Sequence, residues 1–151
     1  MKIVFITLVT ILMGVWSHPS FAADSIVILK ATVQIPMVKG HPAKGSITLQ
    51  NNSSEDIILT QISLSHAQRV EIHESVMENE VSKMLKLENL SIKAGETLDM
   101  GERSLHFMVF GLDKNLSVGN VINGKFEFLK LENIYNEFKI VKLEMNSHKM
   151  Y

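Results

Sequence analysis

The sequence predicts an all-β fold, namely an antiparallel β-sandwich. Short runs rich in Val, Ile and Phe recur along the chain, and Gly, Pro, Asn or Ser residues separate them. Apolar and polar residues alternate within several of these runs, as they do in strands with one buried face. No stretch has a strong helical period of apolar residues, so we expect no amphipathic helix. Short strands separated by turn residues in this way are typical of a sandwich of two packed sheets.

The beginning of the chain predicts a secretory signal peptide over residues 1–22. A lysine precedes the almost wholly apolar segment 3–15, which is shorter than a typical membrane-spanning helix. Small residues favour cleavage after Ala22, with cleavage after Ala23 or an uncleaved anchor as alternatives. Residues 23–151 would then form the secreted protein, without membrane insertion. Because the chain contains no cysteine, we expect neither a lipid anchor nor a disulfide.

Length and charge predict a single domain that does not bind polyanions. The chain that follows the signal peptide is long enough to form a hydrophobic core without disulfides. Loss of Lys2 leaves 14 basic against 16 acidic residues, a net charge of −2. This near-neutral balance argues against nucleic acid or an anionic membrane as a partner. The sequence also lacks the motifs of a Walker loop, a serine hydrolase, a zinc protease and a dinucleotide-binding fold, so we expect no enzyme.

The strands are predicted one after another, with short connections between them. Gly and Pro mark the loop 37–42, and Asn and Ser mark the turn 51–54. The polar segment 77–82 is interpreted as a hairpin loop, and residues 92–96 as a turn between two brief strands. The longer strands are predicted over residues 26–35, 46–50, 57–65, 69–74, 83–87, 105–110, 125–131 and 138–145.

Two histidines and two methionines occupy the outward phase of three predicted strands. His106 and Met108 alternate with apolar residues, so they share the face of their strand that points away from the core. His73 and Met84 alternate with apolar neighbours in the same way. Methionine commonly fills gaps in cores, so two methionines in this phase are unusual. We therefore expect all four side chains to gather on one exposed patch.

Together, these four side chains predict a binding site for a soft metal ion. Imidazole suits copper in either oxidation state, and a neutral thioether binds Cu(I) well but hard cations poorly. The absence of cysteine excludes thiolate ligands and, with them, a blue-copper electron-transfer site. Glu71 and Glu74 flank the first histidine and are interpreted as solvated charges, because carboxylates prefer harder ions.

Further histidines and methionines are possible auxiliary ligands. Met77 lies four residues after His73 and could approach the site from the hairpin. The C-terminal tail 145–151 contains His148 and Met150, a second His-x-Met pair that predicts a weak contact for Cu(II).

The spacing of the four main ligands resembles the motif of the PCuAC family of periplasmic copper chaperones. Ten residues separate His73 from Met84, twenty-one separate Met84 from His106, and one separates His106 from Met108. The segments 45–52, 70–74, 92–97 and 106–112 also resemble that family, and the similarity covers roughly residues 26–143. One departure is the tail, which is shorter than the His- and Met-rich tails of many family members.

The resemblance implies a cupredoxin-like Greek-key sandwich that binds Cu(I) in the periplasm. It also implies a monomeric metallochaperone that passes copper to a protein recipient, either in the assembly of cytochrome oxidase copper centres or a Sco-family protein. The alternative is a metal-free β-sandwich that serves as an adhesion or assembly module, since such domains share an architecture without sharing an activity. The two interpretations differ in one respect, because a pure binding module has no need to gather two histidines and two methionines.

Overall fold

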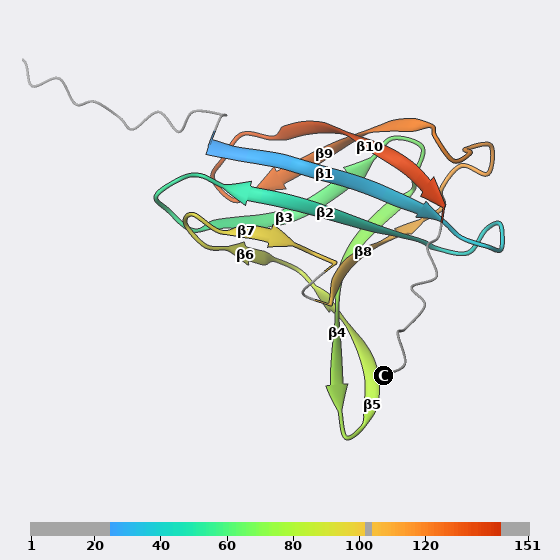
Figure 1. Cartoon of the computed structure of the whole chain (residues 1–151), viewed down its shortest axis with the longest axis horizontal. Coiled ribbons are helices and arrows are strands. Elements are labelled where there is room, and N and C mark those ends of the chain that lie inside the picture. The colour runs from blue at the N-terminus through green and yellow to red at the C-terminus, as the bar shows by residue number, and fades with distance from the viewer. Residues whose placement is uncertain (1–24, 102–103, 143–151) are drawn as a thin grey trace, which may run out of the picture.

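The computed structural model describes residues 25–101 and 104–142 of the chain. This part of the chain is all-β, so the predicted fold class is confirmed (Figure 1). Among these residues no helix has the length and apolar character needed to cross a bilayer. The strands are β1 (Ile26–Ile35), β2 (Ala43–Asn51), β3 (Ile57–Leu64), β4 (Arg69–Glu78), β5 (Val81–Leu87), β6 (Leu90–Ile92), β7 (Thr97–Asp99), β8 (Leu105–Phe110), β9 (Val121–Phe128) and β10 (Ile134–Lys142).

The strands form one hydrogen-bonded path that curls over into a sandwich. Their order is β5-β4-β8-β2-β1-β10-β9-β3-β6, and β7 pairs with β2 beside this path. The paired strands of the described residues are antiparallel except β1 and β10, which run parallel with Val33 opposite Ile140. Strand β8 lies between β4 and β2, although it follows both of them by many residues. This insertion brings the two predicted ligands on β8 beside the one on β4.

Alternating side chains fill the space between the two layers. Phe107 of β8 meets Phe138 of β10 edge to face, with ring centroids 5.8 Å apart. Phe126 of β9 stacks on the other side of Phe138 at 5.5 Å. The Phe107 ring lies against the backbone of Gly45 on β2, where a methyl group would overlap it. Glycine at this position therefore allows β8 to pack closely against β2.

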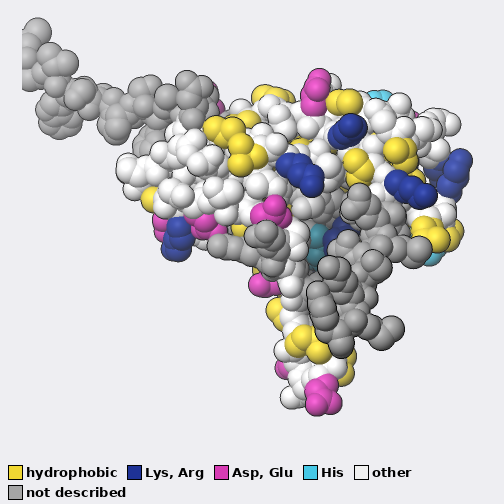
Figure 2. All heavy atoms as spheres, in the orientation of Figure 1, with side chains coloured by type: hydrophobic (Ala, Val, Ile, Leu, Met, Phe, Trp, Pro, Cys, Tyr) yellow, Lys and Arg dark blue, Asp and Glu magenta, His cyan; other side chains and the backbone are white. Residues whose placement is uncertain are grey.

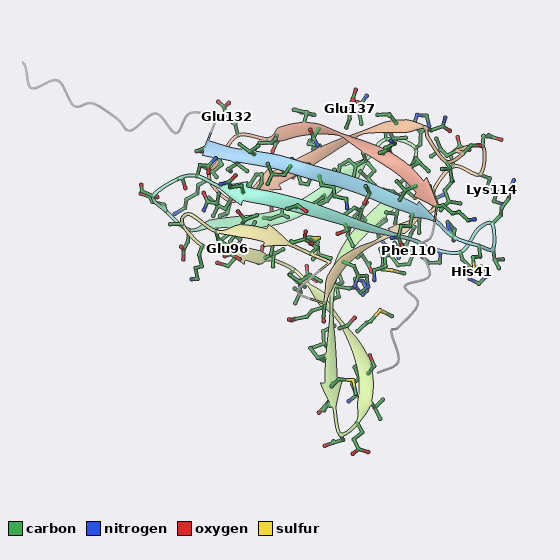
Figure 3. The ribbon with its side chains drawn as sticks, viewed as in Figure 1. His41, Glu96, Phe110, Lys114, Glu132 and Glu137 are labelled. Carbon is green, nitrogen blue, oxygen red and sulfur yellow. The ribbon has the colours of Figure 1, made fainter. Side chains whose placement is uncertain are left out.

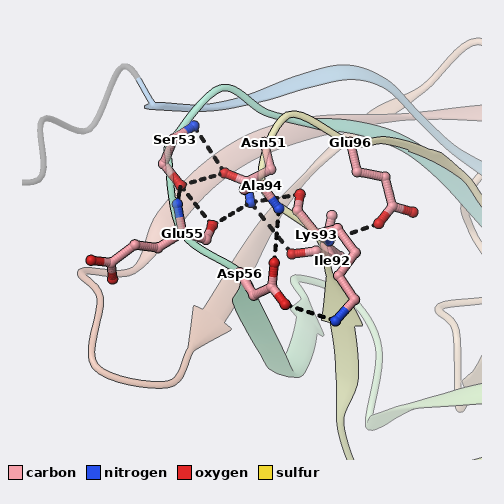
Figure 4. A network of polar contacts seen from close by, with 8 residues as sticks. All are labelled: Asn51, Ser53, Glu55, Asp56, Ile92, Lys93, Ala94 and Glu96. Atoms are coloured by element: carbon pink, nitrogen blue, oxygen red, sulfur yellow. Dashed lines mark hydrogen bonds and ion pairs between the residues drawn. The ribbon is translucent and has the colours of Figure 1, made fainter.

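A buried asparagine joins β2, in the middle of the strand path, to the segment that follows β6 at one end of it (Figure 4). Asn51 at the end of β2 is fully buried, and its amide nitrogen donates to the carbonyl oxygens of Glu55 and Lys93, both at 2.9 Å. Its side-chain oxygen accepts from the backbone and hydroxyl of Ser53. Because Lys93 follows β6, this one side chain ties β2 to the far end of the path and closes the sandwich.

The hairpin of β4 and β5 projects from the body of the sandwich (Figure 1). The sequence predicted a hairpin loop over residues 77–82, and that length is wrong. Only Asn79 and Glu80 form the turn, and both have positive φ, 51° and 64°. A two-residue turn of this kind matches the twist of the paired strands. The prediction missed the strand residues because the tip is solvated on both faces, so its sequence is polar without alternation.

Candidate metal centre

The two histidines face each other across adjacent strands. His73 on β4 is directly opposite His106 on β8 in the antiparallel register, so both side chains leave the same face of the sheet. Their ring centroids are 5.9 Å apart and the rings are tilted by 37°. One ion between two imidazoles at this separation could contact both.

The two methionines lie on the same face, on either side of the histidine pair. Met108 is two residues after His106 on β8 and is opposite Glu71 on β4. Met84 on β5 is opposite Ser75, while His73 is opposite Lys86, so Met84 lies diagonally across from His73. Diagonal neighbours in a sheet are about 7–8 Å apart at the backbone, within reach of a long side chain. The registers therefore bring together all four residues that the sequence singled out.

The exposure of the four side chains differs in a graded way. His106 is only 5% exposed, whereas Met84 is 60% exposed. His73 and Met108 lie between these extremes. The prediction of one exposed patch is therefore wrong for His106. Its strand is covered on both edges by β4 and β2, whereas β5 is the edge strand of the projecting hairpin.

Burial also changes the acid–base behaviour of His106. Removal from water lowers the pKa of this imidazole below its ordinary value of 6.5. The positive charges of Lys44 and of protonated His73 lower the pKa further, while a hydrogen bond with the Ser104 backbone acts in the opposite direction. The His106 ring is therefore neutral, and able to act as a ligand, to a lower pH than an exposed histidine.

A carboxylate that the sequence assigned to solvent contacts the site. The side chain of Glu71 is only 19% exposed, and its Oε2 atom lies 3.2 Å from Nε2 of His73. Its other oxygen lies 3.0 Å from Nε of Arg69 and 4.0 Å from Nζ of Lys86. The bond with His73 lowers the pKa of Glu71, and the two cations act in the same direction against the effect of burial. The interpretation of Glu71 as a solvated charge is thus wrong, although its spacing of two residues from His73 placed both on one face.

One ring nitrogen of His73 has no hydrogen-bond partner in the described part of the chain. This atom is Nδ1, and it is buried. A buried polar atom without a partner is costly, and it is rare away from functional sites. A carboxylate accepts hydrogen bonds and does not donate them, so Nε2 carries the proton that faces Glu71. Nδ1 of the neutral ring then holds a free lone pair.

The donor atoms of the cluster are of the kind that a soft metal ion prefers. Within the described segments, no three side chains from His, Asp and Glu come together in a manner suited to a metal ion. A metal ligand set built around the histidine pair would therefore have to include the thioethers. Such a set of nitrogen and sulfur donors suits copper far better than a hard cation.

The auxiliary ligands are placed only in part. Met77 lies on the same face of β4 as His73, but it is opposite Ser82 near the hairpin tip and is 71% exposed. His148 and Met150 lie outside the described residues, as does the predicted signal peptide.

Figure 2 shows apolar side chains along the projecting hairpin and acidic ones at its tip. Exposed apolar residues of the hairpin include Met77, Val81, Met84 and Leu85.

Comparison with known protein families identifies the chain. A model of the LpqE-like lipoprotein family matches residues 26–140. This protein belongs to the LpqE-like family. The matched region contains all four candidate ligands and all ten strands except the end of β10. No curated protein sequence matches this chain at a significant level.

Solved structures of PCuAC domains have the same fold. The chain is similar to the copper-bound PCuAC domain from PmoF2, with a TM-score of 0.65 at 13% identity over 79% of this chain and 94% of that one. It is also similar to the solution structure of CuI-DR1885 from Deinococcus radiodurans, with a TM-score of 0.54 at 20% identity over 75% of this chain and 76% of that one. At these identities the likeness establishes a shared β-sandwich fold for this member of the LpqE-like family.

Proposed function

We propose that this LpqE-like protein is a metallochaperone that binds one Cu(I) ion through His73, Met84, His106 and Met108. The observation that carries the proposal is the register between β4 and β8, which sets the two imidazoles opposite each other with the thioethers on the same face. Two structures with the same fold are described as copper-bound and as a CuI form, which supports copper as the cargo. The buried, unpartnered Nδ1 of His73 is a ready ligand atom.

The ligand set favours Cu(I) over other biological cations. All four ligands are neutral, so the bound ion keeps its positive charge, and a soft ion loses least from neutral sulfur. Zn(II) prefers thiolates, carboxylates or several imidazoles. Neutral ligands also hold Cu(I) less firmly than paired thiolates do, which suits a carrier that must release its cargo.

The graded exposure of the ligands suggests how release would begin. Met84 is 60% exposed on an edge strand, so an incoming ligand from another protein can reach the ion from that side. His106 is buried and would leave last. We propose a recipient in the assembly of cytochrome oxidase copper centres or a Sco-family thiol protein, with the tail residues His148 and Met150 as a weak Cu(II) contact.

We also propose a location for this function. The family description names a lipoprotein, which supports export, and residues 1–22 have the pattern of a signal peptide. We therefore place the function in the periplasm, with cleavage after Ala22. Intact-mass measurement of protein recovered from the periplasm tests this, since a mass that includes residues 1–22 contradicts cleavage.

The alternative of a metal-free adhesion or assembly module has less support. A site without a ligand gains nothing from burying an imidazole nitrogen that has no hydrogen bond. The exposed apolar side chains of the hairpin would fit a protein contact, but a chaperone also needs a contact with its recipient.

Anaerobic titration of residues 23–151 with Cu(I) against a competing chelator tests the proposal. We expect one tightly bound ion, and X-ray absorption should count both nitrogen and sulfur neighbours. His41→Ala is the matched control, because Figure 3 places this exposed histidine in the β1–β2 loop, at the right-hand end of the molecule. Absence of stoichiometric Cu(I) binding, or an affinity for Zn(II) at or above that for Cu(I), would refute the copper function.

A further inference from the structure

The carboxylate beside His73 is held from more than one direction. Arg69 lies 3.0 Å from Oε1 of Glu71, and its guanidinium also packs over the Phe110 ring at 4.3 Å from the centroid. Lys86 approaches the same oxygen from β5 at 4.0 Å. With Oε1 engaged by cations, Oε2 is left to face the imidazole of His73. The position of the carboxylate is therefore set by residues of both strands of the hairpin.

This arrangement selects one of the two neutral forms of the ring. An imidazole can carry its proton on Nδ1 or on Nε2, and a carboxylate acceptor beside Nε2 favours the proton there. In the other form, two lone pairs would face each other across 3.2 Å, and buried Nδ1 would carry a proton without an acceptor among the described residues. Both consequences are unfavourable, so the fold imposes the form with Nδ1 free.

We propose that Glu71 is a positioning residue, which holds His73 with Nε2 protonated so that Nδ1 is the atom that binds copper. The inference rests on the proposed function and adds to it the ligand atom and the residue that selects it. A carboxylate bonded to the far nitrogen of a ligating histidine also fixes the ring orientation and raises its basicity. The histidine pair is thus unequal, because His106 bonds to the backbone of Ser104 instead of to a charged group.

The role predicts a graded series of variants at one position. Glu71→Gln keeps a side-chain oxygen that can accept from Nε2–H, so it should keep most of the Cu(I) affinity. Glu71→Ala removes the acceptor and should weaken Cu(I) binding by about tenfold to a hundredfold, as loss of such outer partners commonly does. Glu78→Ala is the control, since Glu78 lies on the same strand but is exposed and pairs with Lys83 near the hairpin tip.

Nitrogen NMR of the imidazoles separates positioning from a merely structural role. In the metal-free protein at about pH 8, where an unperturbed histidine is neutral, His73 should show a protonated Nε2 and an unprotonated Nδ1. Glu71→Ala should populate the other form, and Glu71→Gln should restore the first. On addition of Cu(I), the resonance of Nδ1 should shift while the Nε2 proton stays in place.

Each opposite result overturns the inference. A metal-free His73 protonated on Nδ1, a Cu(I)-dependent shift on Nε2, or an unchanged His73 spectrum and affinity in Glu71→Ala would each do so. If Glu71→Ala does not fold, the wild-type spectra with and without Cu(I) still decide the ligand atom. A wild-type protein that binds no Cu(I) refutes the proposed function instead, and the metal-free spectrum then tests the positioning by itself.

Discussion

The sandwich contains two buried polar clusters at different places, and they differ in whether their buried polar atoms have hydrogen-bond partners. At the end of β2, the Asn51 side chain donates to backbone carbonyls and accepts from Ser53, so both of its polar atoms are paired. On the outer face of β4 and β8, Nδ1 of His73 is buried without a partner in the described part of the chain. The first cluster stabilises the fold, whereas the second leaves an acceptor free.

The difference separates structural from functional polar residues. Burial of a polar group is tolerated when its hydrogen bonds are made, so the first cluster needs nothing more. An unmet buried acceptor costs stability, and such atoms are rare in native structures away from functional sites. The two clusters therefore make contrasting predictions for stability and for Cu(I) binding.

The largest effect on stability is expected for Asn51→Leu. The change leaves the carbonyl of Glu55, in the β2–β3 turn, and that of Lys93, after β6, without their donor. We therefore expect a loss of about 3 kcal/mol in the free energy of unfolding. Urea denaturation measures it. Cu(I) affinity of the folded variant should stay unchanged, because the site lies on other strands. A loss below about 0.5 kcal/mol would show that the network is dispensable.

His73→Phe should have the opposite effects, a large loss of Cu(I) affinity and little change in stability. It removes a ligand and should weaken Cu(I) binding at least about a hundredfold, about 2.7 kcal/mol in binding free energy. It also removes the buried, unpaired nitrogen, so the metal-free protein should keep its stability to within about 1 kcal/mol. Competition titration and urea denaturation measure the two quantities. Strong destabilisation of the metal-free variant would mean that this histidine is structural.

Met84→Leu should have a smaller effect that is confined to binding. The side chain is 60% exposed, so its loss opens no cavity and should not change the stability measurably. Loss of one neutral thioether should weaken Cu(I) binding about tenfold, about 1.4 kcal/mol. Met37→Leu is the matched control, because Met37 is exposed and lies in the β1–β2 loop. Equal affinity of the two variants would exclude Met84 from the site.

The smallest effect concerns an exposed ion pair beside the Asn51 cluster. Hydrogen bonds from Lys93 and from the backbone of Ala94 lower the pKa of Asp56 below its ordinary value of 3.8. A carboxyl with a lowered pKa stabilises the fold above pH 3.8, and this contribution is lost as the pH falls through the lowered value. Asp56→Asn should therefore flatten the acid limb of a plot of thermal midpoint against pH. An unchanged acid limb would show that the pair contributes nothing.

Several parts of the fold could be predicted from local sequence. The bounds of β1 and β8 agree with the prediction, because Pro36 and Gly111 end these two apolar-rich runs sharply. The outward phase of His73, His106 and Met108 was equally predictable, since it depends only on the period of two in a strand. The ends of β4 and β5 were not, because a solvated hairpin tip has no buried face to impose alternation.

Other features depend on residues that are far apart in the chain. The sequence by itself determined an all-β chain and the strand face on which His73, Met84, His106 and Met108 lie, because both follow from neighbours one or two residues away. Only the tertiary structure decided that β8 enters between β4 and β2, that β1 and β10 run parallel, and that His106 is buried. It also decided that Glu71 meets both Arg69 and Lys86 while it faces His73. Strand order and burial are set by which distant apolar faces pack together, and that choice is not encoded in any one segment.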